Sequence, residues 1–399
     1  MALIEIRGLT TIFGPRPKVA LERVRAGATK AALLAEMDHM LALRDVDLDV
    51  QKGEIFVVMG LSGSGKSTLV RHINRLIEPT TGRITIDGAD VLRLSPAGLV
   101  DLRRRKVSMV FQRFGLLPHR TVIDNVAYAL ELNGVPRQDR TARAAEWLGR
   151  VGLEGYATHY PVELSGGMQQ RVGLARALCA DTDIVLMDEP FSALDPLIRG
   201  ELQDQLVELQ KSVGKTIVFI THDLDEALRL GDRIAILKDG MLSQVGPPAE
   251  ILLRPADDYV RAFVRDVNRA RALTVKALMR PPALRLTAET LDEALAAMLR
   301  AGAEIGYVID GERFSGIVTQ AGLERARAGT PPHLRLISLA EAGPVVAESA
   351  ALESALPALL GSAYPLPVVD GDGRLAGVVA ADDVGAALAP VAPLRAAGQ

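Results

Sequence analysis

Residues 60–68 read Gly-Leu-Ser-Gly-Ser-Gly-Lys-Ser-Thr, and this stretch decides the fold of the segment around it. It follows the apolar run Ile55–Met59, which predicts a buried strand, and it precedes a helical pattern that is predicted to run to about Leu76. Glycines let consecutive backbone N–H groups turn inward, where they and the start of the helix can bind phosphate oxygens. The pattern G-x-x-x-x-G-K-[ST] between a strand and a helix therefore predicts a nucleotide-phosphate loop.

Each polar group of this loop has an expected task. Lys66 is expected to reach the β- and γ-phosphates of ATP, and the Ser67 hydroxyl is expected to bind Mg²⁺. A chance match to the pattern is the alternative, and the strand before the loop and the helix after it argue against that alternative. The predicted nucleotide-binding residues are Gly60, Ser62, Gly63, Ser64, Gly65, Lys66, Ser67 and Thr68.

Composition excludes several classes of protein. The 399 residues carry 46 Lys and Arg against 49 Asp and Glu, a formal charge of −3, which argues against a protein that binds nucleic acid over its whole surface. Although 48% of the residues are hydrophobic, we find no uninterrupted apolar run of the length that a membrane span needs, and no signal-peptide pattern at the N-terminus. Cys179 is the single cysteine, which fits a reducing compartment.

Strand and helix patterns alternate along the chain to about residue 245. The pattern begins with a strand over Leu3–Ile6, a helix from about Thr29 to Leu41 and a strand over Leu43–Val50. Such alternation predicts an α/β fold with a mostly parallel sheet.

An alanine-rich internal repeat of about 60 residues follows from about Thr274. Gly306–Asp310 corresponds to Leu366–Asp370, and Phe314–Val318 corresponds to Leu375–Val379. Each copy predicts the order strand, helix, strand, strand, helix. Residues 274–399 carry a net charge of −4, so the repeat is the acidic part of the chain.

Two acids end the apolar run Ile184–Met187. Asp188 suits an Mg²⁺ ion, and Glu189, one residue further, suits a general base that polarises an attacking water molecule. Acids that are merely solvated at the end of a strand are the alternative, which the accompanying phosphate loop disfavours.

A Ser-Gly-Gly turn at residues 165–167 precedes a helix that the pattern predicts over Arg171–Leu178. Free N–H groups and a hydroxyl at the start of a helix form an anion site. A plain helix cap is the alternative.

The order of these motifs resembles the nucleotide-binding subunit of ATP-binding-cassette (ABC) transporters over residues 1–265. The resemblance implies a P-loop NTPase cassette with a RecA-like core, an antiparallel β subdomain and a helical subdomain. It implies that Gln112 touches Mg²⁺ and the attacking water, that His222 holds the γ-phosphate and that Phe13 stacks on adenine. A cation–π contact or core packing of Phe13 is a rival interpretation. It further implies that Ser165, Gly166, Gly167 and Gln169 form the signature that contacts the ATP of a partner subunit, with Asp195 in the D-loop. The expected catalytic residues are Glu189, His222, Gln112 and Lys66, and the expected metal ligands are Ser67, Gln112 and Asp188.

Further features of the sequence, among them a helical insertion at about residues 15–42, make the chain resemble the ATPases of glycine betaine and proline betaine importers. The resemblance implies a homodimer of cassettes on the cytoplasmic face of the inner membrane. Its expected partners are transmembrane permease subunits that dock near Phe114–Pro118, an extracytoplasmic substrate-binding protein that acts indirectly, and no nucleic acid. Another amine, choline or amino-acid cargo is an alternative, and so is a soluble ABC ATPase without a transport role.

The repeat resembles a tandem cystathionine-β-synthase (CBS) pair, with copies at 274–328 and 336–390 after a linker at 266–273. Nucleotide-binding copies carry G-x-x-[ST]-x-x-D. The first copy keeps the hydroxyl at Thr319 and has Gly322 in place of the acid, whereas the second keeps Asp383 and has Ala380 in place of the hydroxyl. Sensing of a nucleotide, sensing of ionic strength through a basic patch such as Arg325 and Arg327, and a purely structural dimerising role all remain open.

Overall fold

The computed structural model describes residues 2–112, 115–192, 194–287, 290–327 and 335–389. The chain divides into two compact units, Met1–Val264 and Arg265–Gln399. Each unit has hydrophobic core clusters of its own.

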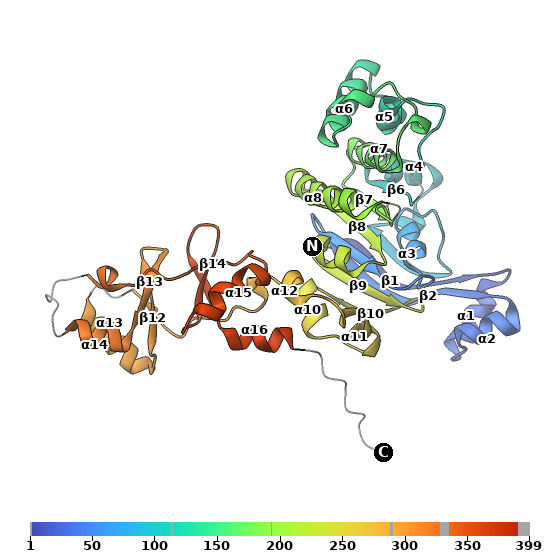
Figure 1. The fold of residues 1–399 in the computed structure, drawn as a ribbon. Helices are drawn as coiled ribbons and strands as arrows, with labels where there is room; N and C mark the ends of the chain where they lie inside the picture. The colour runs from blue at the N-terminus through green and yellow to red at the C-terminus, as the bar shows by residue number, and fades with distance from the viewer. Residues whose placement is uncertain (1, 113–114, 193, 288–289, 328–334, 390–399) are drawn as a thin grey trace. The chain divides into compact units, whose positions relative to one another are not determined.

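Two sheets form the body of the first unit (Figure 1). An antiparallel sheet has the order β2-β1-β4-β5, and a six-stranded sheet has the order β10-β9-β3-β8-β7-β6. The strands are β1 Ala2–Phe13, β2 Met40–Gln51, β3 Ile55–Met59, β4 Thr81–Ile86, β5 Ala89–Asp90, β6 Val107–Val110, β7 Ile184–Asp188, β8 Thr216–Thr221, β9 Arg233–Lys238 and β10 Met241–Gly246.

The six-stranded sheet is parallel except for its β9–β10 pair, as the alternating pattern predicts. Every residue of β3, β7 and β8 is buried. Strands covered on both faces have continuous apolar sequences, which explains why these segments show no alternation of polar and apolar residues. One core cluster includes residues from both sheets and from the helix after the phosphate loop.

Helices cover the sheets and build a separate helical layer. Helices α5, α6 and α7 share their own core, and Figure 1 shows them grouped at one end of the six-stranded sheet. The helices of the first unit are α1 Pro17–Arg25, α2 Lys30–Met37, α3 Lys66–Ile73, α4 Pro96–Arg105, α5 Val122–Leu132, α6 Arg137–Arg150, α7 Gly166–Cys179, α8 Pro196–Val213, α9 Leu224–Leu230, α10 Pro248–Leu253 and α11 Asp258–Val264, with short 3₁₀ turns at Val91–Arg93, Glu154–Tyr156 and Pro161–Glu163.

Four boundaries differ from the prediction, each for a local reason. The first strand continues to Phe13, because Gly8 adopts a left-handed φ of +55° and the register with β2 shifts there. Helix α2 ends at Met37, where Asp38 turns left-handed, so residues 40–42 belong to β2 and not to a helix. Helix α3 ends at Ile73 and not near Leu76, since Arg75 has a φ of +50°. Helix α7 begins at Gly166 and not at Arg171, because Ser165 caps it.

The insertion predicted at about residues 15–42 contains two short helices, α1 and α2. They pack on the ends of β1 and β2 through a small core of Ile12, Ala20, Val24, Leu33 and Leu41. The buried His39 ring joins both ends of this insertion, since Nε2 accepts the Arg16 N–H at 3.1 Å and Nδ1 lies 2.6 Å from the Met37 carbonyl. A Cβ at Gly14 would meet that ring at 2.5 Å, so the position requires glycine.

The second unit contains the two predicted copies of strand, helix, strand, strand and helix. The sheets β11-β12-β13 and β14-β15-β16 each have a parallel pair followed by an antiparallel pair. They meet where the Tyr307 hydroxyl donates to the Pro365 carbonyl at 2.9 Å and Tyr307 packs with Leu375 and Val378. The elements are α12 Arg269–Ala272, β11 Arg285–Leu286, α13 Leu291–Ala301, β12 Ile305–Asp310, β13 Arg313–Thr319, α14 Gln320–Arg327, β14 Val346–Ala347, α15 Leu352–Gly361, β15 Leu366–Val369, β16 Leu375–Val379 and α16 Ala381–Leu388, with 3₁₀ turns at Val275–Ala277 and Leu336–Leu339.

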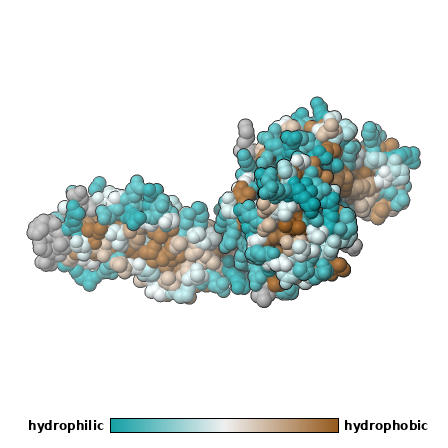
Figure 2. Space-filling view, turned by 90° about the horizontal axis from the view of Figure 1, so that it is seen from above, coloured by the Kyte–Doolittle hydropathy of each residue, from teal (hydrophilic) through white to brown (hydrophobic). Residues whose placement is uncertain are grey.

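Surface and interior polarity agree with the composition. Hydrophobic residues on the face in Figure 2 form separate patches among hydrophilic ones. Across the described ranges, no helix is both long and apolar enough to cross a membrane. Cys179 lies in the core of the helical layer, and burial raises the pKa of its thiol to about 12.

Candidate nucleotide site

The phosphate loop lies between β3 and α3, as its pattern predicts. Gly60 and Gly65 have positive φ angles and no room for a side chain, because a Cβ would lie 2.2 Å from the Leu237 carbonyl oxygen and 2.6 Å from the Ala42 carbonyl oxygen, respectively. Gly63 is also left-handed, at a φ of +77°. The neighbouring backbone therefore fixes the path of the loop, and two of its glycines cannot be replaced without moving that backbone.

Two polar side chains in the loop indicate that it is built for an anion. The Ser64 hydroxyl oxygen is buried without a hydrogen-bond partner among the described residues. The buried Lys66 ammonium donates to the Gly60 carbonyl at 2.8 Å and to the Leu61 carbonyl at 3.1 Å. Burial lowers the pKa of Lys66, against the opposing effect of Glu189 and Asp188. A phosphate group would give both side chains a better partner than the structure gives them.

Asp188, at the end of β7, is buried beside the start of α3. Its Oδ1 accepts the Ser67 hydroxyl at 2.7 Å, and its Oδ2 accepts Arg71 Nη2 at 3.1 Å. A hydroxyl and a carboxylate oxygen are ligands that Mg²⁺ favours, so this pair fits the ion. In the described part of the chain, no group of three or more His, Cys, Asp and Glu side chains has an arrangement that could hold a metal ion, so this pair would need further ligands from the nucleotide and water.

Glu189 lies at the centre of the predicted catalytic group. Its Oε2 accepts Gln112 Nε2 at 3.3 Å and lies 3.4 Å from His222 Nδ1. Glu189, Gln112 and His222 follow β7, β6 and β8, which are neighbours in the parallel sheet. Three separate sequence motifs therefore meet at the carboxyl ends of these strands, which we call the catalytic edge. Glu189 adopts a left-handed backbone φ of +47°. Residues other than glycine and asparagine seldom adopt this conformation, and where they do they are often found at functional sites.

A network that the sequence did not predict connects this edge to α8. Arg199 Nη2 donates to the Leu194 carbonyl at 3.1 Å and Nη1 donates to Asp223 at 3.4 Å. The buried Glu226 accepts Thr221 Oγ1 at 2.6 Å and Gln203 Nε2 at 3.1 Å. Burial raises the pKa of Glu226. Since Thr221 immediately precedes His222, the network ties the D-loop side of α8 to the backbone that carries His222.

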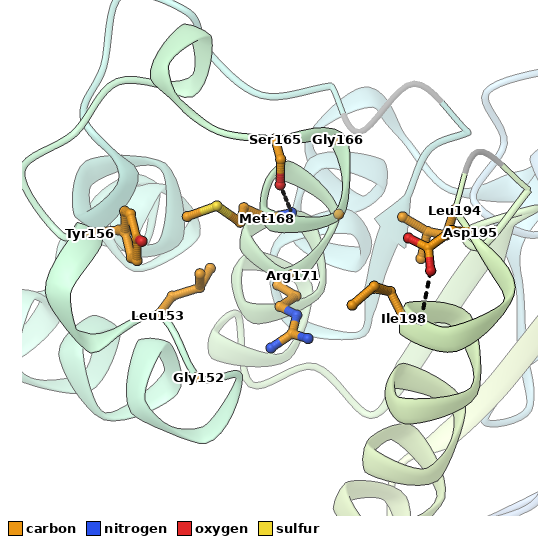
Figure 3. A pocket seen from close by; sticks show the side chains of 11 residues that line it. Gly152, Leu153, Tyr156, Ser165, Gly166, Met168, Arg171, Leu194, Asp195 and Ile198 are labelled. Atoms are coloured by element: carbon orange, nitrogen blue, oxygen red, sulfur yellow. Dashed lines mark hydrogen bonds between the residues drawn. The ribbon is translucent and has the colours of Figure 1, made fainter.

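Three of the predicted signature residues, Ser165, Gly166 and Gly167, line a pocket of about 500 Å³ together with Asp195 of the predicted D-loop. Figure 3 shows Ser165 and Asp195 each accepting a backbone N–H, from Met168 at 3.3 Å and from Ile198 at 3.1 Å. Gly166 and Gly167 open helix α7 into this pocket. Gln169 instead donates to the Pro161 and Leu164 carbonyls, so it stabilises the turn before the helix.

Phe13, predicted to stack on adenine, lies at the end of the first strand. Phe13 is the last residue of β1, is paired with Met40 of β2 and is partly exposed. Its pair with Met40 lies two pairs along the ladder from the pair that Leu43 forms with Thr11. Phe114, in the predicted docking segment, lies outside the described residues. The rest of that segment is held by Arg176, which donates to the Gly115 carbonyl at 2.7 Å, and by Asn125, which accepts the Leu117 N–H at 2.7 Å.

The structure thus brings together Lys66, Ser67, Gln112, Asp188, Glu189 and His222. Sequence reasoning missed Arg71, Arg199 and Glu226. Arg71 lies one helical turn after Ser67, so it shares a helix face with a predicted ligand, and that spacing is the one signal that could have indicated it.

Comparisons with known proteins agree with this geometry. A family model described as ABC transporter matches residues 43–192. The glycine betaine/proline betaine transport system ATP-binding protein ProV of Escherichia coli is 46% identical over 381 residues, 94% of this chain and 95% of its own length. The trimethylamine N-oxide transport system ATP-binding protein TmoW of Pelagibacter ubique is 49% identical over 280 residues, 70% of this chain and 82% of its own. A solved dimeric structure of the ATP-binding cassette MJ0796, bound to ADP and Pi in a post-hydrolysis state, has 34% identity and a TM-score of 0.52 and covers 61% of this chain and 98% of that one.

The chain belongs to the ATP-binding subunits of ABC transporters. It is accordingly an ATPase that binds ATP, which confirms the resemblance found in its motifs.

Proposed function

We propose that this ATPase supplies the energy for a bacterial importer of a quaternary amine osmoprotectant such as glycine betaine or proline betaine. A relative that matches 94% of the chain is named as the ATP-binding protein of a glycine betaine/proline betaine transport system. The convergence of Gln112 and His222 on Glu189, beside the phosphate loop, supports the hydrolytic role. Trimethylamine N-oxide is the second candidate cargo, because it is also a small methylated amine and the name of another relative includes it.

The residues divide the hydrolytic work among them. Glu189 would act as the general base toward the attacking water, which Gln112 would help to orient, and His222 would hold the γ-phosphate. Lys66 would exchange its loop carbonyls for phosphate oxygens. Ser67, Asp188 and Gln112 would hold Mg²⁺, which neutralises phosphate charge when it is bound.

The signature pocket supports a dimer of two copies. Ser165, Gly166 and Gly167 line a pocket that contains no residue of the phosphate loop, so the ATP that they would contact belongs to a partner chain. A head-to-tail pair places each signature over the other copy's phosphate loop, and the solved relative is dimeric. Closure around ATP would then drive the transport partner.

The same proposal places the chain on the cytoplasmic face of the inner membrane. The permease would dock near Phe114–Pro118, in which Arg176 and Asn125 bind the backbone of Gly115 and Leu117. An extracytoplasmic binding protein would deliver the cargo to that permease.

The second unit would serve as a CBS-like regulatory pair, with copies at 274–328 and 336–390 and a linker at 266–273. Arg280 pairs with Asp383 at 3.2 Å, and the Thr319 hydroxyl accepts the Gly322 N–H at 3.1 Å. Both remnants of the nucleotide pattern therefore already have a partner within the chain. This favours a regulatory input other than an adenine nucleotide.

Uptake in a reconstituted system tests the central proposal. Vesicles that contain the chain, its permease and a binding protein should accumulate labelled glycine betaine when ATP is supplied on the side of the chain. The Glu189→Gln variant should still bind ATP, but it should hydrolyse ATP at least about 100-fold more slowly than the natural chain. Uptake should be lost with the hydrolysis. Glu208→Gln, an exposed change on α8, is the matched control. Normal uptake with Glu189→Gln would exclude the mechanism, and accumulation of trimethylamine N-oxide alone would replace the cargo.

A further inference from the structure

Tyr259 lies on α11, outside every motif of the nucleotide site, yet its hydroxyl reaches the phosphate loop. The Leu61 N–H donates to the Tyr259 hydroxyl oxygen at 3.3 Å. The hydroxyl in turn donates to the Leu237 carbonyl at 3.3 Å. Tyr259 therefore bridges the entrance of the loop and the end of β9.

Both hydrogen bonds join backbone groups that are closely packed around Gly60. The Leu237 carbonyl is the group that leaves no room for a Cβ at Gly60. The Leu61 N–H belongs to the same peptide unit as the Gly60 carbonyl, which accepts Lys66 Nζ at 2.8 Å. Lys66 holds one side of this peptide, and Tyr259 holds the other.

The packing around Tyr259 fixes where its hydroxyl points. Asp257 accepts the Val260 N–H at 2.8 Å and the Ser243 hydroxyl, which anchors the start of α11 to β10. The Tyr259 ring stands edge-on to Phe263, with centroids 5.0 Å apart, and Lys238 Nζ lies 5.0 Å from its centre. Burial raises the pKa of Tyr259, so its hydroxyl keeps its proton and remains a donor at neutral pH.

We propose that Tyr259 is a positioning residue for ATP binding, which holds the Gly60–Leu61 peptide in place when Lys66 turns from the loop carbonyls to the phosphates. At that moment the peptide loses the Lys66 bond, and the bridge through Tyr259 remains. The inference rests on the phosphate loop of the proposed function and on neither the cargo nor the second unit.

Tyr259→Phe in the full-length chain removes the hydroxyl and keeps the ring against Phe263. We expect the Kd for ATP, measured with a fluorescent nucleotide analogue, and the KM to rise about three- to tenfold, as for the loss of one or two neutral hydrogen bonds. The kcat should stay within about twofold, since the group acts on the bound nucleotide only through the loop. The melting temperature should fall more for the ATP-bound protein than for the nucleotide-free protein, whereas the loss of a merely structural tyrosine would lower both equally.

Tyr364→Phe, an exposed tyrosine of the second unit, is the matched control and should change neither constant. Equal Kd and KM in Tyr259→Phe and the natural chain would overturn the proposal, and so would a fall in kcat at unchanged KM. Because nucleotide binding is measured on the isolated chain, it can succeed where the uptake experiment fails, and the two proposals fail separately.

Discussion

Two glutamates near the catalytic edge have opposite surroundings. Glu189 faces Gln112 and His222 at the open edge of the sheet, whereas Glu226 is buried among Thr221, Gln203 and Arg199. A carboxylate that must act on water needs the first setting, and a carboxylate that holds backbone in place can use the second.

The buried glutamate leads to a prediction about pH. Burial raises the pKa of Glu226 above its ordinary 4.5, so its contribution to stability is complete below about pH 4.5 and is lost as the pH rises through the raised value. Glu226→Gln cannot ionise, although its amide NH2 replaces one of the two oxygens that accept from Gln203 and Thr221. The natural chain should therefore lose unfolding free energy between about pH 5 and about pH 8, and the variant should not share this loss. The difference in unfolding free energy between variant and natural chain should shift in favour of the variant at the higher pH.

Denaturant unfolding at the two pH values measures this shift, with the exposed Glu208→Gln as the control. A difference that does not change with pH would show that Glu226 does not titrate as its burial demands.

At this scale the sequence predicts residues whose motif is local. Asp188 and Glu189 end an apolar run, and Lys66 lies in a glycine loop, so each carries its own signal. Arg71 meets Asp188 across 117 positions of sequence, and Tyr259 meets Leu61 across 198. Only the folded sheet brings such pairs together, and no spacing in one sequence encodes them.

Among the elements, α7 and α4 form a natural pair for comparison. Both helices begin after a serine whose hydroxyl accepts a backbone N–H three residues later, Met168 at 3.3 Å for Ser165 and Gly98 at 3.2 Å for Ser95. Only Ser165 lines the signature pocket.

Replacing these two caps separates the anion site from the plain helix cap. Ser165→Ala and Ser95→Ala should each lose about 1 kcal/mol of unfolding free energy. Only Ser165→Ala should also lose ATP hydrolysis, by at least about tenfold, because its hydroxyl would contact the partner's ATP. Hydrolysis rates and unfolding curves of both variants decide the matter. Equal loss of activity in the two would reduce the signature serine to a cap.

Element boundaries are where the sequence pattern is least informative. The prediction ends the first strand at Ile6, whereas Gly8 carries it through a bulge to Phe13. The prediction starts α7 at Arg171, because glycines weaken a helical pattern, while the Ser165 cap lets the helix begin among them. Tertiary packing and capping decided both ends.

For the whole molecule, the phosphate loop, the catalytic edge and the signature pocket all lie within Met1–Val264. A chain that ends at Leu273 retains α11 and Tyr259 and should keep its ATPase rate within about twofold, since each unit has its own core. If the second unit is the regulatory input, this shortened chain should lose the salt response of ATPase activity in permease-containing vesicles.

Activity measured over a series of salt concentrations, for both chains in the same vesicles, gives the comparison. An unchanged salt response in the shortened chain would rule out the regulatory role. A lost ATPase rate would instead show that the second unit supports the cassette itself.

The sequence predicts the overall organisation of both units, because each unit carries a signal that recurs along its length. The parallel sheet follows from alternating strands and helices, and the second unit follows from two matching stretches, Gly306–Asp310 and Leu366–Asp370. The pairing of Arg280 with Asp383 could not be predicted, because it joins a loop of the first copy, before β11, to helix α16 of the second copy.

Cys179 has a practical consequence for experiments of this kind. It is the single cysteine of the chain, and with a pKa of about 12 its thiol stays protonated and therefore unreactive at neutral pH. Thiol-specific reagents should therefore leave the natural chain unlabelled at neutral pH. A cysteine introduced at an exposed position such as Leu360, which is 79% exposed, would carry the one reactive thiol, and spectroscopic labels could follow each unit without removal of a native residue.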